Sequence, residues 1–213
     1  MKLYGRTTSF NVQKVLWLLE ELQLSFEHIE VGGRHGGLND KNFVQLNPMR
    51  KVPVLVDGDN VVWESHTILR YLASEYGSAQ WQIHDAYQRT LYERWMDWSQ
   101  VIFQPAFMTT FWGYYRQPPA QRDMEEVNRA LDICHDCLET LSEQLTKTPY
   151  LAGSQLSLAD IVVGAALYRL TEQGLDVRLP ESVSVWYSHL RVRDGYQKWI
   201  MSDFTELKGR TDY

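Results

Sequence analysis

The stretch KLYGRTTSFNVQKVLWLLEELQL (residues 2–24) decides the fold. Residues 2–5 are short and apolar at alternate positions, which is typical of a strand, and residues 6–9 are polar. Apolar side chains then recur at helical spacing, at Val12, Val15, Leu16, Leu19 and Leu22. The pattern predicts a strand, a loop and an amphipathic helix.

The next segment, residues 25–31, alternates loosely between apolar and polar residues and ends at Gly32-Gly33. It predicts a second strand, parallel to the first and joined to it by a right-handed crossover. A short helix is expected over 41–46. Two apolar runs, 52–56 and 61–63, then flank an Asp-Gly turn and predict a β-hairpin.

A helix should follow the hairpin, with Ser65 as its N-cap and Gly77 at its end. Beyond Gly77 the apolar spacing is helical, as in Leu91, Trp95, Trp98 and Ile102, and prolines break it into about five helices. We therefore expect an α+β protein. A mixed four-stranded βαβ-ββα domain would span residues 1–77, and an all-helical domain would span residues 86–213.

Composition and charge exclude several classes of function. The net charge is -6, with 8 basic and 9 acidic residues up to position 76 and 13 against 18 after it, so neither half offers a basic face for nucleic acid. The longest apolar run, 161–168, is far shorter than the roughly 20 residues that span a bilayer. Residues 1–6 become polar before any apolar stretch of signal-peptide length develops, and two cysteines suit a reducing compartment. We expect a cytoplasmic protein that binds neither membranes nor nucleic acid.

Four motifs in this order resemble the cytosolic glutathione transferases over nearly the whole chain. They are Thr7-Thr8-Ser9-Phe10-Asn11, Asn47-Pro48-Met49-Arg50-Lys51-Val52-Pro53, Trp63-Glu64-Ser65 and Ser157-Leu158-Ala159-Asp160-Ile161. The pattern looks most like the bacterial serine-type enzymes related to the theta, delta and beta classes. The resemblance implies a thioredoxin-like N-terminal domain that binds glutathione as co-substrate.

The loop after the first strand would hold the glutathione sulfur. A thiol with a pKa of about 8.5 is mostly protonated at neutral pH, so the enzyme must stabilise the thiolate. Ser9 stands before a helix, where its hydroxyl and the helix dipole could do this. Thr8 and Asn11 are rivals in the same loop, and Ser9 as a simple helix cap is the structural alternative.

The resemblance also implies the contacts with the rest of glutathione. Val52-Pro53 would be a cis peptide bond that turns the backbone of Val52 toward the cysteinyl residue. Glu64 and Ser65 would bind the γ-glutamyl end. Candidates for the glycyl carboxylate are Arg50 first, because its fork binds carboxylates in two places, and then Lys51 and His35.

An apolar electrophile pocket is expected from aromatic side chains near the Ser9 loop, namely Phe10, Phe107, Phe111, Trp112 and Tyr115. Asp160 belongs to a capping box and should serve folding. The group Cys134-His135-Asp136-Cys137 lies within one helical turn and cannot surround a metal, so no metal site is expected.

Two classes of function remain open. The first is an enzyme that adds glutathione to a small apolar electrophile, or uses it in peroxide or disulfide exchange reactions. The second is a non-catalytic binding or regulatory protein on the same scaffold. Since such proteins often lose the glutathione contacts, the presence of Ser9, Val52-Pro53 and Glu64-Ser65 favours the enzyme. By resemblance, the protein should form a two-fold symmetric homodimer.

Overall fold

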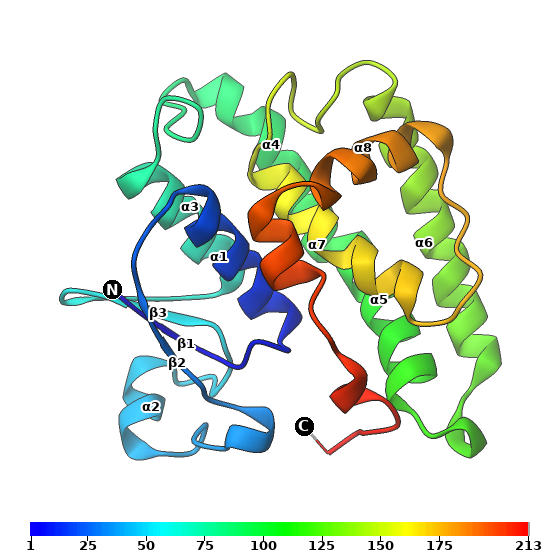
Figure 1. Cartoon of the computed structure of the whole chain (residues 1–213), viewed down its shortest axis with the longest axis horizontal. Helices are drawn as coiled ribbons and strands as arrows, with labels where there is room; N and C mark the ends of the chain where they lie inside the picture. The colour runs from blue at the N-terminus through cyan, green and yellow to red at the C-terminus, as the bar shows by residue number, and fades with distance from the viewer. Residues whose placement is uncertain (213) are drawn as a thin grey trace.

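The computed structural model describes residues 1–212 and places a small sheet domain beside a larger group of helices (Figure 1). The sheet contains β1 (Lys2–Tyr4), β2 (Glu27–Ile29), β3 (Val54–Asp57) and β4 (Asn60–Trp63). Its order is β2-β1-β3-β4, with β1 and β2 parallel and the other two pairs antiparallel. The predicted βαβ-ββα order and the mixed four-stranded sheet are confirmed.

Helices cover both faces of this sheet (Figure 1). Leu3 and Leu55 point into the main core, with α1 (Phe10–Glu21) and α3 (Ser65–Tyr76). On the opposite face Val54 packs with Phe43 of α2 (Lys41–Leu46) in a small separate cluster. Successive residues of one strand therefore serve two different cores, as the alternation of strand side chains requires.

The predicted N-cap of α3 is wrong by one residue. Ser65 is the first helical residue, and Glu64 occupies the N-cap position with a φ of 70°. Ser65 makes no capping hydrogen bond, and its side chain is 5% exposed beneath the start of the helix. Gly77 does end the helix, and its amide donates to the carbonyl of Ala73 at 3.1 Å.

One long helical rod opens the second part of the chain. It runs through α4 (Ala86–Trp98), η2 (Ser99–Phe103), α5 (Gln104–Thr110) and η3 (Phe111–Arg116), and η2 and η3 are π-helical. A π turn adds a residue to the helical repeat and shifts the buried face. Ile102 is consequently 45% exposed, whereas Phe103 is fully buried. The sequence prediction placed Ile102 on the apolar face because it assumed an uninterrupted α-helix.

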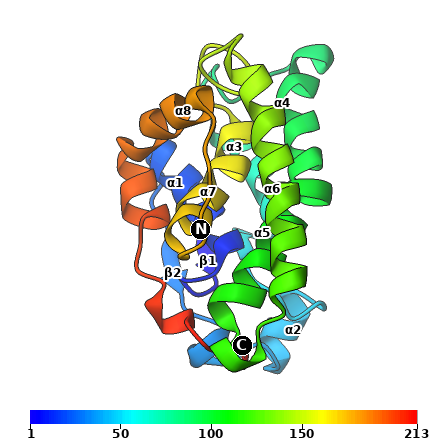
Figure 2. The same ribbon diagram turned by 90° about the vertical axis from the view of Figure 1, so that its right-hand side faces the viewer.

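The remaining helices pack around α7 (Leu158–Glu172), which is buried on nearly all sides and contacts both α1 and α4. α6 (Met124–Leu145) packs beside α5, and α8 (Glu181–Arg191) contacts α6 (Figure 2). Cys134 and Cys137 of α6 are buried free thiols. Within residues 1–212 no helix is long and apolar enough to cross a membrane.

Candidate functional site

The sheet register brings three of the four motifs to one edge. Tyr4, the last residue of β1, pairs with Val54, the first residue of β3, and Val54 pairs with Trp63, the last residue of β4. The segments that follow Tyr4, precede Val54 and follow Trp63 therefore emerge side by side. The structure thus brings together the Ser9 loop, Val52-Pro53 and Glu64-Ser65.

Gly5 allows the Ser9 loop to lie close to its neighbours. Its φ is 146°, and a Cβ at this position would lie 2.5 Å from Cγ2 of Val12 and 3.1 Å from Cβ of Val52. Only glycine fits such a close approach at a positive φ. The loop is therefore pressed against both α1 and the segment that precedes β3.

Ser9 occupies the N-cap position of α1, and its carbonyl accepts a hydrogen bond from Gln13 N at 2.9 Å. Its hydroxyl makes no capping hydrogen bond to the helix. The neighbouring Thr8 hydroxyl is engaged, because Oγ1 donates to Oε1 of Glu206 at 2.7 Å. The two hydroxyls therefore differ in their hydrogen bonding: that of Thr8 donates to Glu206, whereas that of Ser9 makes no hydrogen bond to the helix backbone.

The Val52-Pro53 peptide bond is cis, as the resemblance implies. Asn47, which is 2% exposed, braces the loop before it, with Nδ2 donating to Lys51 O at 2.8 Å and Oδ1 accepting from Met49 N at 2.9 Å. Arg50 and Lys51 are exposed on this loop, and Arg50 has a φ of 54°.

His35, the third predicted cation, is exposed on η1 (Gly33–His35). Its Nε2 lies 3.5 Å from a carboxylate oxygen of Glu30 and accepts a hydrogen bond from Arg34 Nε at 3.2 Å. Arg50 is tied to the segment after η1 by a 3.4 Å contact from Nη1 to Oδ1 of Asn39. The three predicted cations therefore lie in two separate loops, Arg50 and Lys51 before β3 and His35 on η1.

Glu64 and Ser65 form the third side of the site. Glu64 is exposed and has a positive φ, a conformation that is uncommon for a residue with a side chain and that recurs at ligand sites. Ser65 Oγ donates to Oδ1 of Asn11 at 3.4 Å. The start of α3 is thereby connected to the start of α1.

Lys14, which was not predicted from the sequence, lies beneath these residues and is fully buried. Its Nζ donates to Asn11 Oδ1 at 3.1 Å and to Gln104 Oε1 at 2.7 Å, and it lies 3.1 Å from Nε2 of His66. It also stands 4.3 Å from the centre of the Phe10 ring. The lysine thus joins α1, α3 and α5, and it holds the amide oxygen of Asn11 inward.

Burial controls the charge of this group. It lowers the pKa of Lys14 from 10.5 to about 7, although the negative charge of Glu64 acts in the opposite direction. Burial, followed by the charges of Lys14 and Arg70, lowers the pKa of His66 to about 2. His66 is therefore neutral at physiological pH, and its Nε2 can accept a hydrogen bond from the lysine ammonium.

Four of the five predicted electrophile-site rings lie together. The Phe10 and Phe107 ring centres are 5.1 Å apart, those of Phe107 and Phe111 are 5.9 Å apart, and Phe111 stacks on Tyr115 at 5.3 Å. All four are buried and extend from the start of α1 into the helical domain. Phe204, which was not predicted, adds a ring 4.9 Å from Tyr115.

Trp112 is not part of this group of rings. It lines an open surface pocket with Met108 and Glu126, and the guanidinium of Arg116 lies 3.7 Å from its ring centre. The π-helical turn η3 turns Trp112 and its neighbour Phe111 in different directions. The place of Trp112 in the electrophile pocket therefore stays a prediction.

The Ser9 loop also contacts the end of the chain, which no sequence motif indicated. Glu206 of η6 (Thr205–Leu207) accepts the hydrogen bond from Thr8 and pairs with Arg34 at 2.8 Å. Phe204 packs against the rings of Phe111 and Tyr115. The structure thus places residues about 200 positions apart in sequence on one side of the site.

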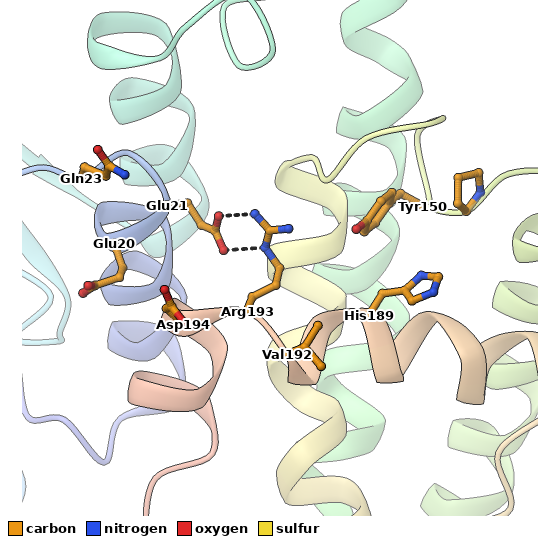
Figure 3. A pocket seen from close by; sticks show the side chains of 10 residues that line it. Glu20, Glu21, Gln23, Tyr150, His189, Val192, Arg193 and Asp194 are labelled. Carbon is orange, nitrogen blue, oxygen red and sulfur yellow. Dashed lines mark hydrogen bonds and ion pairs between the residues drawn. The ribbon is translucent and has the colours of Figure 1, made fainter.

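Another surface pocket, of about 670 Å³, lies away from this edge, between the end of α1 and the end of α8 (Figure 3). Arg193 and Glu21, which both line it, form two hydrogen bonds with each other, and Tyr150 and His189 lie on the other side of Arg193 (Figure 3). None of the predicted site residues lines it.

Comparisons with known proteins agree with this geometry. Residues 1–74 match the glutathione S-transferase N-terminal domain, and residues 124–200 match the C-terminal domain. The chain is 34% identical to the glutathione S-transferase GstB of Escherichia coli K12, over 93% of this chain and 97% of that protein.

Solved structures give the same result. The theta class glutathione S-transferase from Xanthomonas axonopodis pv. citri with glutathione bound is 37% identical, with a TM-score of 0.91 over 96% of this chain and 98% of that chain. A glutathione S-transferase from Pseudomonas fluorescens is 28% identical, with a TM-score of 0.80 over 91% and 96%. The chain belongs to the cytosolic glutathione transferase family.

Proposed function

We propose that this glutathione transferase binds glutathione along the sheet edge between the Ser9 loop, Val52-Pro53 and Glu64-Ser65, and ionises its thiol there. The observation that carries the proposal is the register Tyr4-Val54-Trp63, because it gathers all three segments at one end of the sheet. The similarity to a theta class enzyme with glutathione bound supports it.

In this arrangement each segment takes one part of the tripeptide. The backbone of Val52 pairs with the cysteinyl residue in an extended manner. Glu64 holds the γ-glutamyl ammonium, and the amides at the start of α3 with the Ser65 hydroxyl hold its carboxylate. The exposed cation Arg50 receives the glycyl carboxylate, with Lys51 and His35 as further candidates.

Ser9 is the first choice as donor to the sulfur. Its hydroxyl makes no cap bond, whereas the Thr8 hydroxyl donates to Glu206. The start of α1 adds positive potential, and lowering a thiol pKa by one to two units needs only about 1.4 to 2.8 kcal/mol. Asn11 is the rival, because its oxygen faces Lys14 and Ser65 and its amide nitrogen remains as a donor.

The thiolate then attacks an electrophile held near the ring group Phe10, Phe107, Phe111 and Tyr115. In a substitution, the sulfur–carbon bond forms as the leaving group departs with its electron pair. The same thiolate can attack the oxygen of a hydroperoxide or the sulfur of a disulfide, so peroxidase and disulfide exchange reactions use the same site. Detoxification in the cytoplasm is the setting that we propose for this chemistry.

We also propose that the protein acts as a homodimer. Met49, Val61 and Trp63 of the sheet domain are large apolar side chains with 38% to 57% exposure. Val101 and Ile102 of the helical domain are similarly exposed, at 73% and 45%. Two such patches suit a two-fold contact in which the sheet domain of one subunit meets the helical domain of the other. Size-exclusion chromatography with light scattering at micromolar concentration tests this; a monomer would overturn it.

Binding and catalysis can be tested separately. Retention on immobilised glutathione, with elution by free glutathione, tests binding. A panel of aryl halides, hydroperoxides and mixed disulfides then tests turnover and identifies the reaction. Retention without turnover of any of the three classes would favour the non-catalytic alternative, and failure of both assays would refute the proposed function.

A further inference from the structure

A buried cation adjoins the proposed electrophile site. Arg169 of α7 is 2% exposed, and its Nη2 donates to Thr8 O at 2.9 Å and to Gln13 Oε1 at 3.0 Å. Its Nε is buried without a hydrogen-bond partner, and the guanidinium forms no ion pair with a carboxylate in the part of the chain that the structure describes. A buried charge costs free energy unless it is paired, so an anion bound next to Arg169 would be stabilised.

Two other arginines increase the positive charge at this place. Burial first, and then the charges of Arg6 and Arg116, lower the pKa of Arg169 to about 9, with Tyr115 and Glu206 acting in the opposite direction. Arg6 and Arg116 have further interactions of their own. Glu206 is already shared by Thr8 and Arg34. Arg169 itself therefore carries its charge beside the Ser9 loop without an ion pair to any carboxylate among residues 1–212.

Aromatic rings frame the same guanidinium. Cζ of Arg169 lies 5.5 Å from the ring centres of both Phe111 and Phe204. Phe111 in turn stacks on Tyr115. A cation between aromatic faces matches a ligand that carries both a ring and a negative charge, because the ring gains stacking and the charge gains a partner.

We propose that the electrophile site of this enzyme selects anionic aromatic electrophiles, whose carboxylate pairs with Arg169 while the ring packs against Phe111 and Tyr115. The inference rests on the proposed transferase function. With an aryl chloride, the glutathione thiol first loses its proton to solvent. The thiolate then forms the sulfur–carbon bond, and chloride leaves with the carbon–chlorine electron pair, while the carboxylate stays unchanged.

The ligand reaches Arg169 by displacing side chains of the C-terminal segment, residues 202–212. This segment runs between the sheet domain and α5 (Figure 1), and its Phe204 lies against Arg169, Phe111 and Tyr115. Its contacts with the rest of the chain include the Thr8–Glu206 hydrogen bond, a 3.0 Å bond from Gly209 N to Tyr115 O and a 2.7 Å bond from Arg116 Nε to Arg210 O. Phe204 is the ring that must move aside.

The test compares two electrophiles that share ring and leaving group and differ in charge, a chloronitrobenzoate and the corresponding chloronitrobenzamide. The wild-type enzyme should turn over the benzoate with a kcat/KM higher by about tenfold or more, as a charge-assisted hydrogen bond provides. Arg169→Met should abolish the preference, and Arg169→Lys should retain part of it. Arg129→Met, at an exposed arginine of α6, is the matched control and should keep the full ratio.

The ratio within each variant is the readout, because a loss of folding lowers both rates alike. Equal rates for the two compounds in the wild type would overturn the anion preference and leave the transferase function standing. If neither compound reacts, calorimetric titration of the unreactive nitrobenzoate and nitrobenzamide into the glutathione-loaded protein decides. Tighter binding of the benzoate that depends on Arg169 would support the anion site and count against transfer, whereas equal binding would overturn the site.

Discussion

The amide oxygen of Asn11 accepts a hydrogen bond from the buried ammonium of Lys14, one helical turn further along α1, at 3.1 Å. The same oxygen accepts a hydrogen bond from Ser65 Oγ. The side chain of Asn11 is therefore held by buried Lys14 on one side and by the start of α3 on the other. A lysine that faces no water thus connects the two segments on which we propose that glutathione is held.

Stability should report the charge of Lys14. Its pKa is about 7 in the folded protein and 10.5 when unperturbed, so between these values the unfolded chain binds more protons. Burying the charged ammonium reduces the free energy of unfolding by its full amount below pH 7. This loss decreases as the pH rises from 7 toward 10.5, because the folded protein has then released a proton that the unfolded chain still holds. Denaturant unfolding should show that the free energy of unfolding of wild type minus that of Lys14→Met rises over this range, by up to about 5 kcal/mol. A difference that is independent of pH would contradict the shifted pKa.

Removing the Ser9 hydroxyl should change the pH dependence of catalysis. We expect Ser9→Ala to lower kcat/KM at neutral pH by about 10- to 100-fold and to move the rise of activity up by about one to two pH units. Thr8→Ala should leave the profile in place, because that hydroxyl donates to Glu206. An unchanged profile for Ser9→Ala together with a shifted one for Asn11→Ala would transfer the role to Asn11.

Glu64 should govern the affinity for glutathione. Glu64→Gln removes the charge that faces the γ-glutamyl ammonium, and we expect the Kd from calorimetry to rise by about tenfold, as for a charged hydrogen bond of about 1.5 kcal/mol. Glu75→Gln, an exposed position at the other end of α3, serves as the control. Equal Kd values for the two variants would remove Glu64 from the binding site.

Asp160 should matter for stability and not for glutathione. Its buried carboxylate accepts hydrogen bonds from Leu151 N at 2.9 Å, Ser157 N at 2.8 Å and Trp186 Nε1 at 3.0 Å. Asp160→Ala leaves these donors without a partner, at a cost of about 3 kcal/mol in the free energy of unfolding. Chemical denaturation measures this cost. A normal Kd for glutathione in the folded variant is expected, and a large rise would place Asp160 in the site.

The sequence was sufficient for the sheet domain because its strands and turns follow local patterns. The alternation in residues 2–5 and the Asp-Gly turn each depend on neighbours in the chain. The π turn at residues 99–103 was not predictable in this way, since it follows from tertiary packing and exposes Ile102. The prediction that Ser65 caps α3 was wrong because Glu64 takes the N-cap position with a positive φ, which its residue type does not indicate.

The site was predictable only in part, for the same reason. The segments at the sheet edge could be named from motifs, because strand order fixes where they emerge. Lys14 looked like one polar residue in an amphipathic helix, and only the packing of α1 between α3 and α7 reveals that it is buried. Arg169 and Glu206 reach Thr8 of the Ser9 loop through hydrogen bonds that span 161 and 198 residues, which no local pattern encodes.

The proposed function requires that the Ser9 loop lower the pKa of the bound glutathione thiol. Ultraviolet difference titration of the thiolate, with saturating glutathione on the wild-type protein, measures this pKa directly. We expect a pKa lower by about one to two units than the roughly 8.5 to 9 of a free thiol. A bound thiol that titrates as it does in buffer would contradict it.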